Sequence, residues 1–462
     1  MGISSPGVGS GLDVTTIVSK LMAIERQPLD RLQRQENALQ SKISAFGQMQ
    51  SALSTLQDAA GALSAPGLWQ SAAAASADAS TVSVRATGAA APGSYSVQVD
   101  QLAQRQSAAS APLPASGAFG AGALQITMGT AAAGGFSPDA ARPPVSVAIA
   151  AGDTLAQVRD KINAAGAGVT AAIVSDAAGS RMLIRSAQTG AAQAFGIAAS
   201  GDASLASLAL DPTGAGAGAM TRTQQARDAS YTIDDLALSS PTNVVTGAID
   251  GVALTLAKAG GDPVEVTVAS DRDALKASVK KFADAYNAVN SLLANQTRYD
   301  PATKTAGPLQ GDFAATSVLN RMRGVLRGAL AGAPAGAPAT LSAVGLALQR
   351  DGSLATDAGR LDAALADPAA VGRLFSATDA DASRTGFAQR FSALAASLLG
   401  ADGTVSSATD AMQRMKRSLD DQQSAFQARL DSIQTRLLRQ YTDLDTRLAQ
   451  VQSFTYKAPG GS

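Results

Sequence analysis

The side chains that most enzymes use for nucleophilic, acid–base or zinc chemistry are missing from this sequence. Its 462 residues include no histidine and no cysteine. Their absence removes thiolate nucleophiles, disulfides, the usual zinc ligand sets and the commonest general base. Catalysis would have to depend on carboxylates or lysines. We therefore predict no enzymatic activity, no catalytic residue and no bound cofactor or metal.

Three groups of residues superficially match chemical motifs. Gly7-Val8-Gly9-Ser10-Gly11 has the glycine content of a phosphate loop, but no strand precedes it and no Gly-Lys-Ser/Thr follows. Asp351-Gly352-Ser353 with Asp357 resembles part of a calcium loop, yet the closing glutamate and other oxygen ligands are missing. Turn and cap roles are expected there. The adjacent carboxylates Asp234-Asp235 and Asp420-Asp421 point apart on any strand or helix, so their spacing builds no shared site.

Composition argues against several classes of partner. Lys+Arg and Asp+Glu both number 37, so the net charge of zero gives no attraction to nucleic acid or an anionic membrane. No segment approaches the roughly 18 apolar residues of a membrane span. Aromatic residues are 4% of the chain, too few for a base-stacking or sugar-binding platform. We predict no nucleic-acid binding and no membrane insertion, and we interpret the single tryptophan, Trp69, as a core anchor.

The strongest pattern is a pair of apolar stripes, one at each end of the chain. Apolar residues spaced by threes and fours keep one side of a helix apolar. The first stripe contains Ala38, Leu39, Ile43, Phe46, Met49, Leu53, Leu56, Ala60 and Leu63. The last stripe contains Met412, Met415, Leu419, Phe426, Leu430, Ile433, Leu437, Tyr441, Leu444, Leu448 and Val451. Both stripes need burial and their lengths match, which favours mutual pairing in one coiled coil.

The segment before the first stripe has two parts. Residues 1–11 are rich in glycine and serine and offer little surface to bury, so we expect them to become ordered only with a partner. Asp13 is then expected to cap a helix that carries Ile17 and Leu21. Pro28 predicts a kink or a new helix start.

Strand patterns occupy the middle of the chain. Alternating apolar residues at Tyr95–Val99 and in a meander over 231–268 predict paired strands, with Asp250-Gly251 as a hairpin turn, and residues 145–184 read as a β-α-β-β unit. The predicted fold class is a multidomain α+β protein: a terminal α-helical coiled coil plus a helical layer, with two inserted β-rich head domains. The predicted domains are terminal leg helices at 1–40 and 430–462, a helical coiled-coil domain at 41–75 and 271–429, a β-rich head domain at 76–109 and 226–270, and an inserted second β-rich head domain at 110–225.

Several motifs resemble one protein family, the flagellar filament cap proteins, also called hook-associated protein 2. The resemblance covers nearly the whole chain and is weakest in the Ala/Gly-rich insertion. The motifs that carry it are Ile3 to Asp13, Leu21-Met22-Ala23-Ile24-Glu25, Tyr95-Ser96-Val97-Gln98-Val99 with Gln101-Leu102-Ala103, the flagellin-like Lys161-Ile162-Asn163, Lys281 to Asn290, and Val344-Gly345-Leu346 through Gly352-Ser353-Leu354.

The resemblance implies a function in flagellum assembly. A member of this family is expected to be secreted through the flagellar export apparatus and to form a ring at the distal filament tip. There it would promote flagellin folding and polymerisation and prevent loss of unpolymerised flagellin. The implied partners are other copies of the chain, with a pentamer expected, flagellin, the hook-filament junction protein and a cytoplasmic export chaperone.

The resemblance also assigns roles to the stripes. The terminal helices would form a leg that docks on the growing filament, with the export chaperone holding the last helix before export. The expected leg coiled-coil interface consists of Ile17, Leu21, Leu39, Ile43, Phe46, Leu53, Leu56, Leu419, Phe426, Leu430, Ile433 and Leu437. The expected chaperone contact consists of Ile433, Leu437, Tyr441, Leu444 and Leu448.

Two alternatives stay open at the level of sequence. Flagellin and the hook-filament junction proteins also have paired terminal helices around variable outer domains, although the Tyr95 and Val344 segments favour the cap. A tip adhesin that binds host glycans through its head domains is the alternative from another class. The lack of an aromatic cleft argues against glycan specificity.

Overall fold

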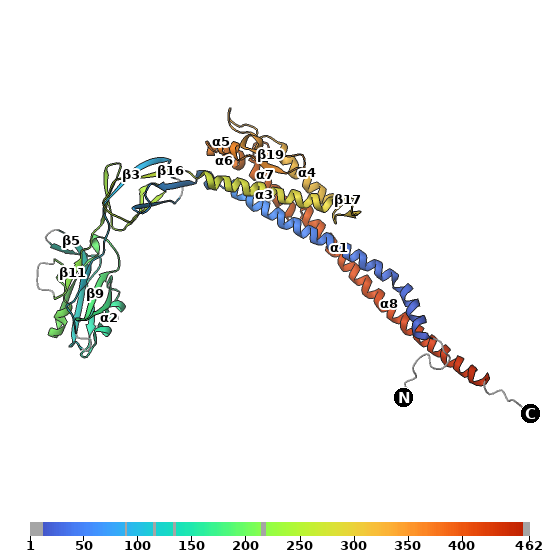
Figure 1. Cartoon of the computed structure of the whole chain (residues 1–462), viewed down its shortest axis with the longest axis horizontal. Helices are drawn as coiled ribbons and strands as arrows, with labels where there is room; N and C mark the ends of the chain where they lie inside the picture. The colour runs from blue at the N-terminus through green and yellow to red at the C-terminus, as the bar shows by residue number, and fades with distance from the viewer. Residues whose placement is uncertain (1–12, 88–89, 114–116, 133–134, 214–218, 456–462) are drawn as a thin grey trace, which may run out of the picture. The chain divides into compact units, whose positions relative to one another are not determined.

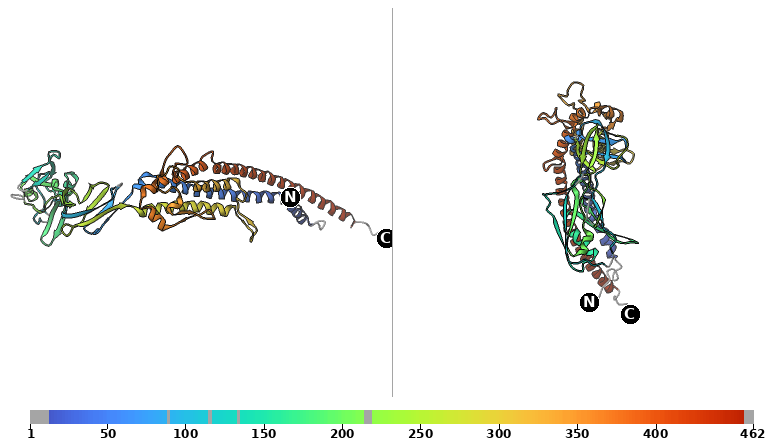
Figure 2. Two further views of the ribbon diagram at one scale, coloured as in Figure 1. Left: turned by 90° about the horizontal axis from the view of Figure 1, so that it is seen from above. Right: turned by 90° about the vertical axis from the view of Figure 1, so that its left-hand side faces the viewer.

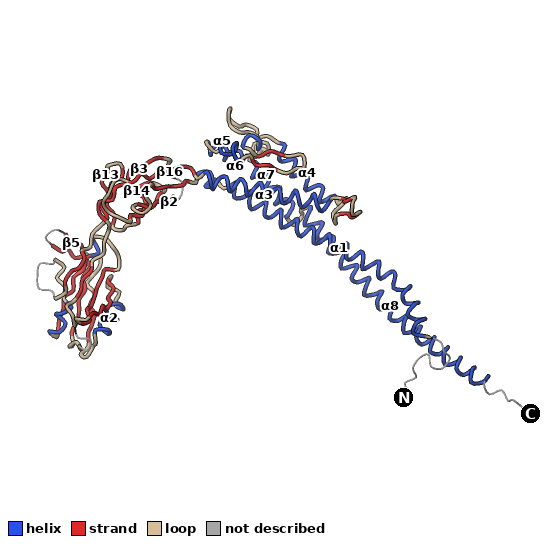
Figure 3. Tube along the Cα trace, viewed as in Figure 1, coloured by secondary structure: helices blue, strands red, loops and turns tan. Residues whose placement is uncertain are grey.

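The chain folds into two compact units, one mainly helical and one built of strands (Figure 3). The structure is a computed structural model that describes residues 13–87, 90–113, 117–132, 135–213 and 219–455. The expected N-terminal arm at 1–11 lies outside the described residues. The helical unit comprises Met1–Trp69 and Arg272–Ser462, and the β-rich unit comprises Gln70–Asp271. Helical ends enclosing a β-rich middle confirm the predicted fold class.

Two long helices dominate the helical unit and pack along each other (Figures 1 and 2). They are α1 (Val14–Ser64) and α8 (Thr404–Thr455). Pro28 lies inside α1, which continues through it, so the predicted new helix start is wrong, while the alternative of a kink at Pro28 stays a prediction. Pro66 follows soon after the last residue of α1, and a proline disfavours helical backbone in the residue before it.

Shorter elements complete the helical unit. They are η1 (Pro66–Gln70), which ends at the unit boundary, α3 (Arg272–Thr297), β17 (Tyr299–Asp300), β18 (Thr305–Ala306), α4 (Phe313–Arg327), η4 (Leu341–Val344), β19 (Leu346–Leu348), β20 (Leu354–Thr356), α5 (Ala358–Ala364), α6 (Pro368–Ser376) and α7 (Phe387–Leu399). Asp357 caps α5 and the Asp351 carboxylate accepts from the Ser353 N–H, as the expected cap and turn roles require.

The core of the helical unit is centred on aromatic side chains. Trp69 stacks on Phe375 with ring centroids 5.6 Å apart, and its indole Nε1–H donates to the Leu63 carbonyl at 2.8 Å. Phe282 of α3 meets Phe375 and Phe391 edge to face at 6.2 and 5.3 Å. Buried aromatic rings of this kind remove large apolar areas from water. The predicted anchor role of Trp69 is thus confirmed within the helical unit.

A partly buried polar network ties the β19–β20 hairpin to α3. The Asn287 side chain donates to the Leu354 carbonyl at 2.9 Å and accepts from the Leu354 N–H at 2.7 Å. The Tyr286 hydroxyl donates to the Gly352 carbonyl at 3.0 Å. Burial raises the pKa of Tyr286 to about 12. Two of the motifs that carry the family resemblance therefore meet here in space.

The described part of the β-rich unit contains four antiparallel sheets and two separate apolar cores. One core lies between the sheet β1-β16-β3-β12-β13 and the sheet β14-β15-β2. Its strands are β1 (Ala72–Ser76), β2 (Val82–Ala86), β3 (Gly93–Gln101), β12 (Ala229–Ile233), β13 (Leu236–Ser240), β14 (Val244–Ile249), β15 (Val252–Leu256) and β16 (Val264–Ser270). The Tyr95 strand pairs with both β12 and β16, as the sequence predicted.

The second core belongs to the segment between β3 and β12. Its sheets have the order β11-β4-β9-β8 and β10-β5-β6, with β7 also on β5. The elements are β4 (Ser107–Ala109), β5 (Gly122–Ala132), β6 (Gly135–Pro138), β7 (Val145–Ile149), α2 (Leu155–Ala164), β8 (Val169–Asp176), β9 (Gly179–Ser186), η2 (Ala191–Gln193), β10 (Ala194–Gly201), η3 (Ala203–Leu208) and β11 (Thr221–Gln224). The β7-α2-β8-β9 order confirms the predicted order of elements, although β7 lies on the sheet of β5 and β8 and β9 lie on the other sheet. The residue limits of the individual domains stay predictions.

The Ile162-Asn163 pair explains how α2 covers the β8 edge. Ile162 is fully buried in the second core. The Asn163 amide donates to the Ala171 carbonyl at 3.0 Å and its oxygen accepts from the Ala171 N–H at 2.7 Å. The side chain thus replaces a neighbouring strand at an edge whose N–H and C=O groups would otherwise be open to pairing.

Candidate functional site

The helices α1 and α8 form the pair to which the sequence analysis assigns the docking role. The helices run antiparallel, because the start of α1 packs against the C-terminal half of α8 while Glu36 meets Lys416 nearer the start of α8. Asp13 caps α1, accepting from the Thr16 N–H at 3.0 Å. Hydrogen bonds from the Thr15 and Thr16 side chains lower the pKa of Asp13 to about 2.

A small apolar cluster holds the free end of the pair together, and we call it the leg cluster. Its buried members are Val14, Val18, Met22, Leu29 and Leu430, and the half-buried Phe426, Ile433, Leu437 and Tyr441 pack against them. Leu430 is only 1% exposed. Four expected interface residues of α8 therefore meet α1 here.

The α1 side of the leg cluster differs from the expected residues. Ile17 and Leu21 are half-buried and lie outside the cluster, whereas Val18 and Met22, one position further along, are buried in it. Extending the heptad of Phe46 and Leu39 backwards by sevens leads to Val18, and this signal could have identified the cluster.

The remaining expected interface residues lie nearer the core of the helical unit. Phe46, Leu53 and Leu56 are buried in that core, which α3, α4, α6 and α7 also build. Leu39 is buried, and Ile43 and Leu419 are half-buried. The stripe residues are therefore divided between a two-helix seam and a multi-helix core.

Polar side chains separate these two regions. Lys416 lies 3.2 Å from a Glu36 oxygen and 3.1 Å from an Asp420 oxygen, and the Gln423 amide donates to Glu36 at 2.7 Å. Hydrogen bonding from Gln423 and Lys416 lowers the pKa of Glu36, and hydrogen bonds to Asp420 and Glu36 raise the pKa of Lys416. Charged and amide groups that face each other across a helical seam specify its register.

Of the expected chaperone contacts, Ile433, Leu437 and Tyr441 face α1 in the leg cluster. Leu444 is 43% exposed and Leu448 is half-buried. Other large apolar side chains of the two helices are open to solvent, namely Ile24, Met415, Leu438 and Val451.

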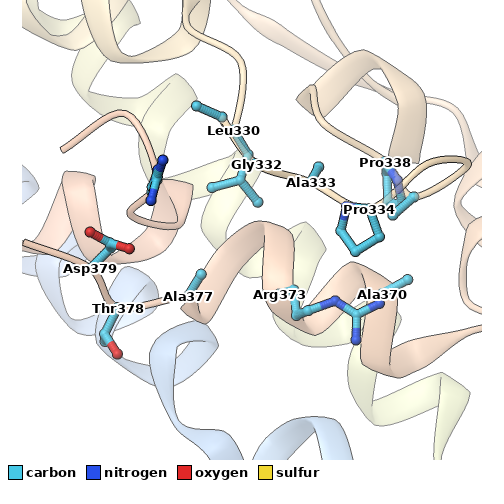
Figure 4. A pocket seen from close by; sticks show the side chains of 13 residues that line it. Leu330, Gly332, Ala333, Pro334, Pro338, Ala370, Arg373, Ala377, Thr378 and Asp379 are labelled. Carbon is cyan, nitrogen blue, oxygen red and sulfur yellow. The ribbon is translucent and has the colours of Figure 1, made fainter. Parts of the chain in front are cut away.

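A separate groove of about 390 Å³ lies in the helical unit between the 330–338 loop and α6 (Figure 4). Its lining is mainly alanine, proline and glycine, with Arg373, Arg384 and Asp379 as charged members. Among the described lining residues, Thr378 is the one with a hydroxyl group. Within the described ranges, no three His, Cys, Asp or Glu side chains are grouped to hold a metal. None of the described helices is long and apolar enough to cross a bilayer.

The nested fold and the paired ends define a class of protein in which both termini build one helical unit around a β-rich middle. Family models agree with this architecture over most of the sequence. The "flagellar hook-associated protein 2 C-terminus" matches residues 226–453, the "flagellar hook-associated protein 2 N-terminus" matches 10–106, and the "flagellin hook IN motif" matches 130–188. The chain belongs to the flagellar hook-associated protein 2 family.

Several relatives match over nearly their whole length. The chain is 32% identical to the A-type flagellar hook-associated protein 2 of Pseudomonas aeruginosa, covering 96% of this chain and 94% of the relative. It is 28% identical to the Escherichia coli K12 flagellar hook-associated protein 2, covering 98% and 96%. The crystal structure of the Escherichia coli flagellar cap protein FliD, domains D1-D2-D3, superposes with a TM-score of 0.64 at 26% identity, covering 80% of this chain and 99% of that one.

Proposed function

We propose that this protein caps the distal tip of the flagellar filament as a homo-oligomeric ring, promotes flagellin folding and polymerisation, and prevents loss of unpolymerised flagellin. The observation that carries the proposal is the agreement with hook-associated protein 2 sequences over nearly the whole chain and with a flagellar cap structure over 80% of it. A ring of five copies is the first stoichiometry to test.

The α1–α8 pair supports a docking role in this function. A cap that moves each time a subunit is added needs contacts that are individually weak and strong in total. Exposed apolar side chains such as Ile24 (62% exposed) and Met415 (59% exposed) supply such contacts on the helical pair. Flagellin and the hook-filament junction protein are the partners that this surface would meet.

Complementation of a motile strain that lacks the gene for this protein tests the proposal. The intact chain should restore swimming and long filaments and remove monomeric flagellin from the medium. A variant without residues 435–462 should leave flagellin in the medium. Motility that does not depend on the gene, or a strain that retains its flagellin without it, would contradict the cap function. Electron microscopy of the purified protein tests the ring.

The predicted contact with an export chaperone has a structural consequence. Ile433, Leu437 and Tyr441 face α1 in the leg cluster, so a chaperone that holds this face must replace α1. Val18→Asp should weaken the docking of α1 without changing α8, because a carboxylate is unfavourable in an apolar cluster. Chaperone affinity measured by calorimetry should then rise. An unchanged or weaker affinity would mean that the chaperone binds elsewhere.

A further inference from the structure

One outer strand of the β-rich unit has a side that is open to another strand. This strand is β13 (labelled in Figure 3), which ends the sheet β1-β16-β3-β12-β13. Its sequence is Leu-Ala-Leu-Ser-Ser, with no charged residue and no proline, and its register with β12 has no bulge. Natural edge strands usually carry one of these features, because an open edge otherwise pairs with another chain.

Other edges of the same unit have such protection. The Asn163 side chain occupies the backbone groups of Ala171 at the edge formed by β8. The register of β14 with β15 shifts between Thr246 and Ile249, and Gly247 has a φ angle of 85° there. A bulge of this kind bends a strand and interrupts its pairing. The regular, uncharged β13 edge therefore differs from these two edges.

The turn before β13 determines which backbone groups face outward. Asp234-Asp235 has φ angles of 48° and 65°, as in the two-residue turns that join hairpin strands. Ile233 and Leu236 flank this turn and form a hydrogen-bonded pair, and such pairs alternate along antiparallel strands. The N–H and C=O groups of Ala237 and Ser239 therefore point away from β12. Both residues are exposed, and no described residue hydrogen-bonds to these groups.

The hairpin that presents this edge is fixed to β3. The Asp234 N–H donates to the Ser96 carbonyl at 2.9 Å, and the Asp234 carboxylate accepts from the Ser96 N–H at 2.8 Å. These bonds hold the turn that precedes β13. The edge is thus already in the conformation that a further strand requires, which lowers the cost of pairing.

The apolar face of β13 is incompletely covered. Leu236 and Leu238 lie opposite Ile233 and Tyr231, which are both buried in the core between the two sheets. Leu236 is nevertheless 65% exposed, whereas Ile233 is 8% exposed. A neighbouring strand with apolar side chains on the same face would continue the core past Leu236.

A second copy of β13 meets these requirements. A two-fold rotation about an axis perpendicular to the sheet places β13 antiparallel to itself and keeps both apolar faces on the same side. With Leu238 at the axis, Ala237 lies opposite Ser239 of the second copy, so the outward N–H and C=O groups of both residues are paired. The two Leu238 side chains then lie side by side, and Leu236 lies diagonal to Leu238 of the second copy. We propose that two copies of this chain associate through β13 in this register.

Charge and strand direction favour this arrangement over others. The two Asp235 carboxylates would lie at opposite ends of the paired strands, roughly 20 Å apart at about 3.4 Å per residue, so they repel each other little. The other end of the sheet, β1, runs in the same direction as β13, because successive strands are antiparallel. With the apolar faces on one side, β13 could pair with β1 of a second copy only in parallel, which is less stable per residue.

This contact is separate from the contacts that close a ring. A two-fold contact uses the same surface on both copies and joins copies only in pairs, whereas a closed cyclic ring needs two different surfaces on each copy. The proposal therefore predicts paired copies or paired rings. It does not rest on the cap function.

Engineered cysteines test the register without background, because the chain has no cysteine. Leu238→Cys places two thiols at the axis, where Cα atoms of a non-hydrogen-bonded pair are about 4.5 Å apart and within disulfide range. Leu236→Cys is the matched control, with the same change on the same face of the strand, but its two copies are about 14 Å apart.

The purified full-length variants are oxidised and analysed on non-reducing gels. Leu238→Cys should give a disulfide-linked dimer and Leu236→Cys should not. Random collisions would favour the control, because Leu236 is the more exposed of the two side chains. An equal or greater dimer yield from Leu236→Cys would overturn the proposal.

A proline tests the backbone pairing without a disulfide. Ala237→Pro removes an N–H that faces away from β12, so the hairpin keeps its own hydrogen bonds. In sedimentation of the full-length protein, this variant should have half the mass of the native assembly at the same concentration. Ser239→Ala is the control, which keeps the backbone groups and should keep the native mass. An unchanged mass for Ala237→Pro, or a native protein that does not pair, would contradict the proposal. Halving of the mass is expected whether or not the copies also form a ring, so failure of the cap function is a separate result.

Discussion

Replacement of Leu430 by alanine should open the free end of the α1–α8 pair and leave the rest of the helical unit intact. Among the described members of the leg cluster, Leu430 is the one fully buried residue of α8, at 1% exposure, while its neighbours Phe426 and Ile433 are half-buried. Buried leucine-to-alanine changes cost about 2–5 kcal/mol, with the lower values where the site can collapse. A two-helix cluster can relax, so we expect about 2–3 kcal/mol.

Hydrogen exchange measures this loss directly, because local opening is read at each segment. Because each 1.4 kcal/mol changes an equilibrium constant tenfold, amide hydrogen exchange in the leg cluster should become roughly 30- to 140-fold faster. Exchange in the core around Phe282 should not change. Leu438→Ala is the matched control, since it removes the same atoms from a side chain on the same helix that is 36% exposed. The reasoning is refuted if Leu430→Ala and the control have equal effects, or if the core opens together with the leg cluster.

Three further changes test other parts of the structure. Asn287→Ala removes both hydrogen bonds to Leu354 and should lower the free energy of unfolding of the helical unit by about 2 kcal/mol, measured by denaturant titration. An unchanged free energy of unfolding would mean that the β19–β20 hairpin is held by packing alone. Asn163→Ala frees the Ala171 edge and should cost the β-rich unit about 1–2 kcal/mol, measured the same way, with unchanged stability as the contrary result. The pKa of Asp13 is about 2 against an ordinary 3.8, so its stabilising effect on α1 is present above about pH 4 and is lost as the pH falls towards 2. Protection of the first turn of α1 from hydrogen exchange, relative to an unfolded chain at the same pH, should fall over this range in the native protein but not in Asp13→Asn. Identical protection profiles of the two proteins would rule out the cap.

The sequence alone predicts where the apolar stripes lie, but it does not predict which residues pack against them. Alternative apolar sets, Ile17 with Leu21 and Val18 with Met22, are both spaced by four, so local periodicity could not decide which set faces α8. The choice depends on the register carried along the helix from Phe46. The burial of Phe46 itself followed from its stripe. That it packs in a core shared with α3 and α7 could not be predicted, because any apolar helix could cover the same stripe.

In the β-rich unit, too, local features could be predicted from the sequence, whereas a contact between two elements could not. The strand alternation and the hairpin turn at Asp250-Gly251 predicted β14 and β15 correctly, because turn chemistry and period are local properties. The Asn163 contact with β8 could not be foreseen, since a side chain that replaces a strand leaves no periodic signal. The expected roles of the leg and chaperone residues depend on other proteins and stay predictions.

The position of the polar side chains in the α1–α8 seam connects these observations. Glu36, Lys416 and Gln423 lie between the leg cluster and the core of the helical unit, so apolar contact is interrupted there. Because their partners are specific, these side chains disfavour sliding of one helix along the other. The interruption also limits how far opening can spread, so the leg cluster can separate while the core remains folded. A helical pair with a fixed register and an end that opens on its own would suit the proposed cap function, in which contacts with the filament are released and made again at each subunit addition.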